Sequence, residues 1–231
     1  MITLDARPES VSFDPQRAAV LVIDMQNDFG SPGGMFDRAG IDIGGISAAV
    51  EATRPVLAAA RAVRIPIVYL AMEHAADLSD AGPPDRPHRL KHLPLAVGVD
   101  PHTLIRGTWN TQIVDALAAE PDDRIVSKHR YSGFFETELD DVLRDLDVSH
   151  LIVTGCTTSV CVESTVRDAM YRDYVCVVLE DCTAEPIGEG LARTNHDASL
   201  TVIETLFGWV SSGAAFREAL ASRIQAPATA G

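Results

Sequence analysis

The sequence has few basic residues and no long apolar run. Lys and Arg together number 19 against 33 Asp and Glu, which gives 231 residues a net charge of −14. Because phosphate groups and anionic lipid surfaces bind clustered positive charge, this balance argues against nucleic acid or a membrane as a partner. No apolar run approaches the roughly 20 residues that cross a bilayer, and the first ten residues lack the apolar segment of a signal peptide. We therefore expect a cytoplasmic protein.

Cysteine is also scarce. The four cysteines, Cys156, Cys161, Cys176 and Cys182, all lie in the last third of the chain. Such a sparse, clustered set does not suggest the disulfide framework of a secreted protein, so we expect reduced thiols. With 46% hydrophobic residues, the chain is able to bury a sizeable core. Its length predicts a single domain over residues 1–231, with a disordered tail at 225–231.

Short apolar runs alternate with stretches of helical periodicity. The runs are typical of buried strands in a parallel sheet; they are Ala18–Ile23, Ile65–Ala71, Arg124–Ser127, His150–Thr154 and Tyr174–Leu179. The predicted helices cover Ile46–Val63, Thr111–Ala119, Thr137–Leu146, Val160–Arg172, Gly190–Leu206 and Ala214–Arg223. This alternation predicts an α/β fold with three layers, a doubly wound and mostly parallel sheet with helices on both faces.

One segment, Glu73–Gly107, interrupts this alternation. It contains five prolines and four histidines. A connection of this length is usually either a functional lid or disordered, and the sequence leaves both possibilities open.

Three polar side chains follow predicted strands. Asp24 ends the run VLVID, Lys128 follows RIVS, and Cys161 lies just beyond HLIVTG at the start of a predicted helix. Each alone has an ordinary explanation, as a turn former, a solvated cation or a small buried residue. Ligands of open α/β sheets bind beyond the carboxyl ends of the strands, so the combination predicts a common site.

The segment GCTTSVCV indicates what that site does. A thiol at a helix N-terminus beside a lysine is expected to have a lowered pKa, which makes Cys161 a candidate nucleophile. A turn of small residues also presents backbone N–H groups to a developing oxyanion. We interpret the other three cysteines as core residues.

At these residues a family resemblance appears. The segments VLVIDMQNDF, SKHRYSGFFET and VTGCTTSVCVESTVRDA resemble the three conserved blocks of the isochorismatase-like cysteine hydrolases. The resemblance extends over about residues 1–211 and implies a catalytic triad of Asp24, Lys128 and Cys161. It also implies a cis peptide before Thr157, an oxyanion hole formed by the N–H groups of Thr157 and Cys161, no cofactor, and a homo-oligomer, either a dimer or a tetramer.

Further segments, some within these blocks, resemble one branch of the family, the ureidoacrylate amidohydrolases of pyrimidine degradation; they are TLDARPESVSFDP, SPGG, RYSGFFET, CVESTVRD and IETLFGWVS. This implies cleavage of a C–N bond in a small substrate, ureidoacrylate or peroxyureidoacrylate, through a thioester. Biuret, triuret and N-carbamoylsarcosine are alternative substrates. Isochorismatase activity, which does not need the cysteine, and a non-catalytic binding role are further alternatives.

The chain departs from that branch at Met72, His74 and Asp80, and again at Ser159. These positions lie where the enzyme is expected to recognise its substrate, so we take them as candidate substrate-binding residues. Three aromatic candidates complete the set: Phe29, Tyr131 and Phe135. The hydroxyl of Tyr131 is a candidate substrate hydrogen bond, although core packing explains it equally well. Metal-dependent relatives carry an Asp-x-His…His pattern where this chain offers His74 alone, so we expect no metal.

Overall fold

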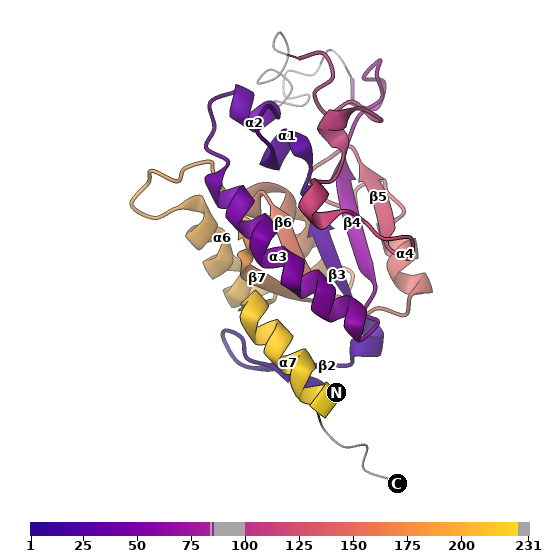
Figure 1. Cartoon of the computed structure of the whole chain (residues 1–231), viewed down its shortest axis with the longest axis vertical. Coiled ribbons are helices and arrows are strands. Elements are labelled where there is room, and N and C mark those ends of the chain that lie inside the picture. Colours follow the sequence, from indigo (N-terminus) through magenta and orange to yellow (C-terminus); the bar gives the residue numbers. More distant parts are fainter. Residues whose placement is uncertain (84, 86–99, 226–231) are drawn as a thin grey trace.

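The computed structural model describes residues 1–83, 85 and 100–225. Its centre is a six-stranded sheet in which every neighbouring pair of strands is parallel (Figure 1). In spatial order the strands are β5 (Arg124–Lys128), β4 (Ile67–Met72), β3 (Ala18–Ile23), β6 (His150–Cys156), β7 (Val175–Ala184) and β8 (Trp209–Ser211). The predicted α/β class with a parallel sheet is therefore confirmed.

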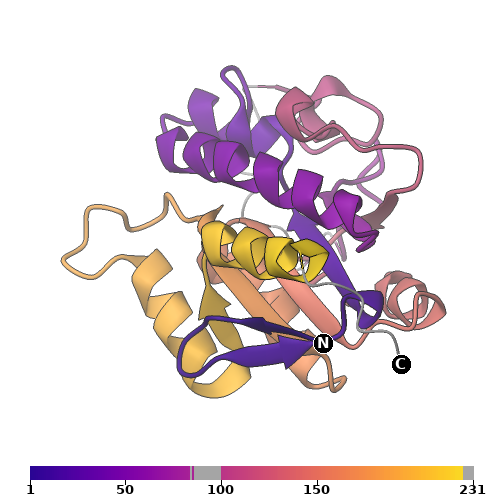
Figure 2. The same ribbon diagram turned by 60° about the horizontal axis from the view of Figure 1, so that its bottom comes forward.

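Helices cover both faces of this sheet. One face packs against α3 (Gly44–Ala62) and α7 (Gly213–Gln225), which lie side by side in Figure 2. The other face packs against α4 (Leu139–Asp145), α5 (Glu163–Met170) and α6 (Asn195–Val202). Strand β3 is buried along its whole length, and its side chains alternate between these two cores. This double burial explains why its sequence, AAVLVI, is continuously apolar.

The strand order changes direction beside β3. The chain adds β4 and then β5 on one side of β3, and returns with β6 on the other side. The crevice at such a change of direction is where open α/β sheets bind ligands. Gly155, near the end of β6, permits a close approach there. Its φ is +129°, and a Cβ atom at this position would lie 2.2 Å from the carbonyl oxygen of Ile23. A side chain at residue 155 would thus push apart the two strands that carry the site.

The predicted helix over Thr111–Ala119 is wrong. The chain instead forms two 3₁₀ turns, Trp109–Thr111 and Asp115–Leu117, joined by extended residues. The backbone bonds of this segment go to a distant partner: Asn27 N donates to Gln112 O, and Val114 N donates to Met25 O. These long-range bonds replace the i to i−4 bonds of a helix.

Other boundaries also differ. The helix predicted from Gly190 begins at Asn195, where the Thr194 hydroxyl accepts from Asp197 N as an N-cap. The short elements β1 (Ile2–Leu4), β2 (Val11–Phe13), α1 (Asn27–Gly30), α2 (Met35–Arg38) and β8 carry too few residues for a periodic signal, and the sequence did not predict them. The disordered tail was expected from Gln225, but that residue ends α7. The rest of the expected tail, from residue 226, lies outside the described residues, as do residues 84 and 86–99 of the proline-rich segment Glu73–Gly107. No described helix is both long enough and apolar enough to cross a bilayer.

Candidate active site

Three side chains meet at the carboxyl ends of the strands. Asp24 follows β3, Lys128 is the last residue of β5, and Cys161 lies in the π-helical turn Thr158–Val162 between β6 and α5. Lys128 Nζ donates to Asp24 Oδ2 at 2.7 Å and lies 3.5 Å from Cys161 Sγ. The three residues that the sequence selected are therefore in mutual contact.

The ion pair is buried. Asp24 is 0% and Lys128 is 1% exposed. Burial disfavours the Lys128 ammonium, but Asp24 and the Cys161 sulfur more than offset this, so the pKa of Lys128 is raised. Nζ also donates to the Arg130 carbonyl at 3.2 Å. These contacts keep a fixed positive charge beneath the thiol.

Burial likewise raises the pKa of Asp24, against the opposing effect of Lys128. Its Oδ1 oxygen has no donor of standard geometry among the described residues, while a hydrogen bond from the Cys161 thiol acts to lower the pKa of the carboxyl group. Asp24 is thus a carboxylate with a raised affinity for protons and an oxygen available to take one.

The expectation of a lowered pKa for Cys161 is not met. Burial first, and the Asp24 carboxylate second, raise the pKa of the Cys161 thiol above its ordinary range. Lys128 acts in the opposite direction but does not compensate. A neutral thiol needs a base before it can act as a nucleophile, and Asp24 is the carboxylate next to Cys161.

The turn before Cys161 has the backbone that the family resemblance implied. The Cys156–Thr157 peptide is cis. Val160 N and Val162 N both donate to Thr157 O, at 3.1 and 3.2 Å. The turn is folded back on Thr157, which places Thr157 and Cys161 along the same cavity.

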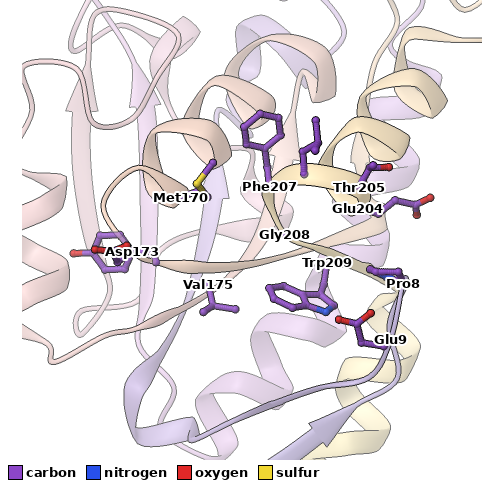
Figure 3. A pocket seen from close by; sticks show the side chains of 12 residues that line it. Pro8, Glu9, Met170, Asp173, Val175, Glu204, Thr205, Phe207, Gly208 and Trp209 are labelled. Carbon is purple, nitrogen blue, oxygen red and sulfur yellow. The ribbon is translucent and has the colours of Figure 1, made fainter.

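That cavity is small and mostly apolar. Its volume is about 100 Å³, and Cys161 lies on its wall. The residues around it are Phe29, Met35, Phe36, Met72, Leu104, Tyr131, Thr157, Val160, Cys161 and Ile187. A larger cavity of about 460 Å³ surrounds Trp209 at the amino ends of β7 and β8, and no triad residue lines it (Figure 3). Cys161 therefore opens onto the smaller cavity, which suits a small substrate, while Asp24 and Lys128 contact Cys161 without lining that cavity.

Comparison with known proteins agrees with this geometry. The isochorismatase domain matches residues 18–215, a range that contains all three clustered side chains. The chain belongs to the isochorismatase family. Ureidoacrylate amidohydrolase RutB of Methylobacterium radiotolerans is 41% identical over 234 residues, covering 99% of this chain and 89% of that protein.

Solved structures of the isochorismatase family share the fold. A cysteine hydrolase from Pseudomonas syringae pv. phaseolicola has a TM-score of 0.78 and 34% identity, with 91% of this chain and 95% of that chain covered. N-carbamoylsarcosine amidase from Thermoplasma acidophilum has a TM-score of 0.64 and 25% identity, with 85% and 96% covered. The recognised family and the architecture are thus shown both by sequence and by structure.

The substrate-binding candidates fall into two groups. Phe29, Met72 and Tyr131 line the cavity. His74, Asp80, Phe135 and Ser159 are not among its lining residues. For these four, substrate contact stays a prediction that the cavity does not support directly.

Those four side chains have other described partners. His74 is buried, and its Nδ1 lies 3.2 Å from Asp80 Oδ1; burial lowers the pKa of this imidazole, although Asp80 opposes the shift. Phe135 is 44% exposed and packs against His129 and Arg130. The Ser159 hydroxyl donates to Glu185 at 2.5 Å.

Gln26 joins the ends of β3 and β4 next to the triad. Its Oε1 accepts from Met72 N at 2.8 Å, and its Nε2 donates to Met72 O and Thr111 O at 3.1 and 2.7 Å. In this isochorismatase-family chain it holds β4, and with it Met72, against the loop that carries Asp24.

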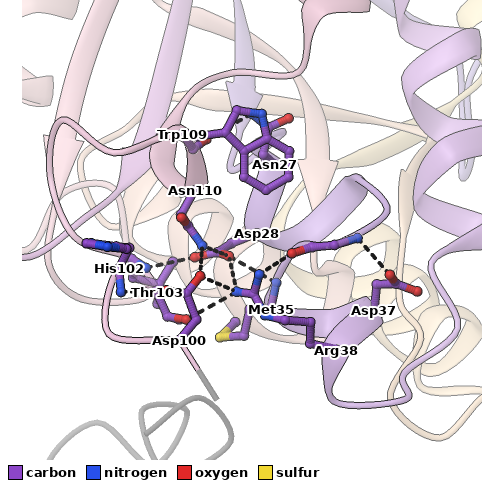
Figure 4. Close-up of polar contacts among 12 residues, drawn as sticks. Asn27, Asp28, Met35, Asp37, Arg38, Asp100, His102, Thr103, Trp109 and Asn110 are labelled. Atoms are coloured by element: carbon purple, nitrogen blue, oxygen red, sulfur yellow. Dashed lines mark hydrogen bonds and ion pairs between the residues drawn. The ribbon is translucent and has the colours of Figure 1, made fainter. Parts of the chain in front are cut away.

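Asp28 organises part of the cavity wall, and sequence reasoning missed it. This fully buried carboxylate accepts from Met35 N at 2.9 Å, Leu104 N at 2.7 Å and Asn110 Nδ2 at 2.7 Å (Figure 4). The Arg38 guanidinium lies 3.6 Å away. Because Met35 and Leu104 both line the cavity, one acid connects two wall segments that are distant in sequence. Its position within VLVIDMQNDF was the available signal.

Replacing Asp28 by alanine is expected to destabilise the fold by about 2–3 kcal/mol, because buried N–H donors and a cation lose their acceptor. Urea unfolding followed by circular dichroism measures this. Asp37→Ala is the matched control, since Asp37 is exposed and accepts only from Gly33 N among the printed bonds of its side chain. Equal stability of the two variants would contradict the role of Asp28.

Proposed function

We propose that this chain is a cysteine amidohydrolase that cleaves a C–N bond of a small ureido or carbamoyl compound, with ureidoacrylate or peroxyureidoacrylate as the first candidates. The observation that carries the proposal is the contact of Lys128 Nζ with both Asp24 and Cys161 at the wall of a small cavity. The choice of ureidoacrylate rests on the 41% identity to ureidoacrylate amidohydrolase RutB. The N-carbamoylsarcosine amidase neighbour supports the alternative of another carbamoyl substrate.

The first half-reaction forms a thioester. Asp24 takes the proton of the Cys161 thiol as Sγ attacks the carbonyl carbon, and the N–H groups of Thr157 and Cys161 receive the developing negative charge. Asp24 then gives that proton to the nitrogen of the breaking C–N bond. The departing amine leaves the acyl group on Sγ.

In the second half-reaction Asp24 deprotonates a water molecule, which attacks the thioester. The C–S bond breaks and the proton returns to the sulfur. Lys128 keeps its charge throughout, and its role is to hold Asp24 and to stabilise the negative charge that appears on sulfur. No group outside the chain is needed for these proton transfers.

The pH dependence of kcat/KM is expected to show an acid limb above the ordinary pKa of aspartic acid, about 3.9. Burial raises the pKa of Asp24, and a protonated Asp24 is unable to accept the thiol proton, so activity falls as pH drops through that raised value. Initial rates across buffers locate the limb. Lys128→Met is expected to move it further upward, because the ammonium lowers the pKa of Asp24; an unmoved limb would argue for a different base.

An ammonia-release screen tests the function. Wild type is incubated with ureidoacrylate, biuret, triuret and N-carbamoyl amino acids, and the thioester is sought by mass spectrometry of the acid-quenched protein. Isochorismatase activity, which does not need the thiol, would survive alkylation of Cys161. A binding protein would release no ammonia from any compound in the screen, which would end the proposal.

A homo-oligomer, dimer or tetramer, is part of the proposal. Leu206 is 68% exposed and lies in the segment Glu204–Val210 (ETLFGWV), which we propose as an apolar contact surface. Apolar surface of this kind is usual at subunit contacts. Light scattering measures the mass directly.

A further inference from the structure

Glu185 is a buried acid beside the turn that carries Cys161. It follows β7, directly after Ala184, and is 7% exposed. Its Oε2 accepts from Ser159 N at 2.9 Å and from Ser159 Oγ at 2.5 Å, and its Oε1 accepts from Ile187 N at 3.0 Å. Both carboxylate oxygens of Glu185 thus accept hydrogen bonds from neighbouring residues of the site.

A buried carboxylate is costly unless its surroundings compensate the lost hydration. Asp24 and Asp28, the other buried acids at this edge of the sheet, each have a cation within 4 Å. Within the described part of the chain, Glu185 makes no ion pair, and its partners are N–H and O–H donors. A neutral side chain at this position would avoid the free-energy cost of burying a charge. The presence of a carboxylate is therefore best explained by the groups that it binds.

Glu185 binds the middle of the turn Thr157–Cys161, here called the nucleophile turn. Ser159 lies two residues after Thr157 and two residues before Cys161, the two residues whose N–H groups receive the oxyanion in the proposed mechanism. The bonds of Val160 N and Val162 N to Thr157 O close the turn from within. The two bonds of Ser159 to Glu185 attach it from outside, to the end of β7.

The third bond reaches the cavity wall. Ile187 lines the cavity that contains Cys161, and its N–H is held by the same carboxylate that holds Ser159. One side chain therefore sets the nucleophile turn and part of the wall relative to β7. Since oxyanion donors work at about 2.7–3.1 Å from the charged oxygen, a small shift of this turn weakens transition-state binding.

We propose that Glu185 is a positioning residue, which acts through Ser159 to place the N–H groups of Thr157 and Cys161 for the oxyanion. The proposal rests on the proposed function, because it takes Cys161 as the nucleophile. A positioning role, unlike a role in stability alone, predicts different effects on two kinds of reaction of Cys161. Loss of Glu185 impairs reactions of Cys161 that develop an oxyanion and spares those that do not.

Two reagents separate these reactions. p-Nitrophenyl acetate acylates the thiol: the Sγ–C bond forms, the ester C–O bond breaks, the thiol proton passes to Asp24 and p-nitrophenolate leaves, with an oxyanion developing on the carbonyl oxygen. Iodoacetamide alkylates the same sulfur at a saturated carbon and releases iodide, so no oxyanion forms. Both rates are measured on the full chain, with Cys161→Ala as the blank.

Glu185→Ala is expected to lower the acylation rate on the order of 10²-fold, the scale of a lost oxyanion donor or a misplacement of about 1 Å. The alkylation rate is expected to stay close to wild type. With an amide substrate, kcat falls while KM changes little, since the donors act mainly in the transition state.

Three further variants complete the test. Glu185→Gln keeps an acceptor for Ser159 N and is expected to recover most of the acylation rate. Ser159→Ala removes one of the two bonds and is expected to reduce acylation by a smaller factor, which keeps the proposal testable should Glu185→Ala fail to fold. Glu189→Ala is the matched control, because Glu189 is exposed four residues along the same segment, and it should react as wild type does.

Two results would overturn the proposal. Acylation and alkylation falling by the same factor in Glu185→Ala and Ser159→Ala would mean a general disturbance of the turn. Unchanged acylation in all Glu185 and Ser159 variants would mean that the contact is dispensable. If Cys161→Ala instead reacts with both reagents as wild type does, the nucleophile assignment itself is wrong, and the positioning role fails with it.

Discussion

Replacing Cys161 by alanine is expected to lower kcat for the amide substrate by at least about 10⁴-fold, because a covalent route loses its nucleophile. Substrate binding should survive, since the apolar wall formed by Phe29, Phe36 and Met72 is untouched. Ammonia release under single-turnover conditions measures the rate, and equilibrium binding measures the affinity.

The matched control is Cys176→Ala. Cys176 is a buried thiol on β7 that lies in the same core cluster as Cys161, and burial raises its pKa to about 12. It is expected to keep a rate near that of wild type, with a modest loss of stability from the lost sulfur atom. A Cys161→Ala protein that still turned over substrate at the wild-type rate would refute the covalent mechanism.

Asp24→Asn is expected to lower kcat by more than about 10³-fold, as loss of a general base does together with the loss of nucleophile activation, and to destabilise the fold by about 3–5 kcal/mol. The second effect follows because Lys128 would stay buried without its carboxylate partner, whether as an uncompensated ammonium or after giving up its proton. Urea unfolding, with ammonia release as the parallel assay, measures both.

Lys128→Met is expected to cost less stability, because the orphaned Asp24 can neutralise itself by taking a proton. Its folded pKa, already raised by burial, rises further without the ammonium. The folded state then holds a proton that the unfolded chain has released, so stability falls as pH rises from the ordinary aspartate pKa through the raised folded value. Unfolding at pH 5 and pH 8 tests this sign.

The double variant Asp24→Asn/Lys128→Met removes both buried charges. It is expected to regain a large share of the stability lost in Asp24→Asn while remaining inactive, since paired buried ions contribute little net stability compared with neutral groups. Additive stability losses would show that the two side chains do not interact as the 2.7 Å contact implies.

The electrostatics of Cys161 show where reasoning from sequence alone reaches its limit. A helix start and a nearby lysine predicted a lowered pKa for the thiol. The structure adds two effects that no local pattern predicts, full burial and the neighbouring Asp24 carboxylate, and these raise the pKa of Cys161 instead. In the proposed mechanism the thiol therefore depends on Asp24 for its activation, which gives the acid a larger role than the helix and lysine alone suggested.

Several features of this protein were determined by the sequence itself. Continuous apolar runs such as AAVLVI predicted strands buried on both faces, and the polar residues that end them, Asp24 and Lys128, predicted the position of the site. Short-range signals of this kind are reliable because a strand end and its next residue are neighbours in the chain. The three blocks also identified the family, which the comparison with known proteins confirms.

Only the tertiary structure decided which side chains surround that site. Asp28, Gln26 and Glu185 each make at least one contact with a residue 26 to 82 positions away in sequence. Ser159 contacts Glu185 and does not line the cavity, because β7 ends beside the turn that carries Cys161. The segment after Asn110 forms turns in place of the predicted helix since its backbone bonds reach Met25 and Asn27. Long-range hydrogen bonds leave no periodic trace in the sequence, and burial acts on a pKa only once the chain has folded.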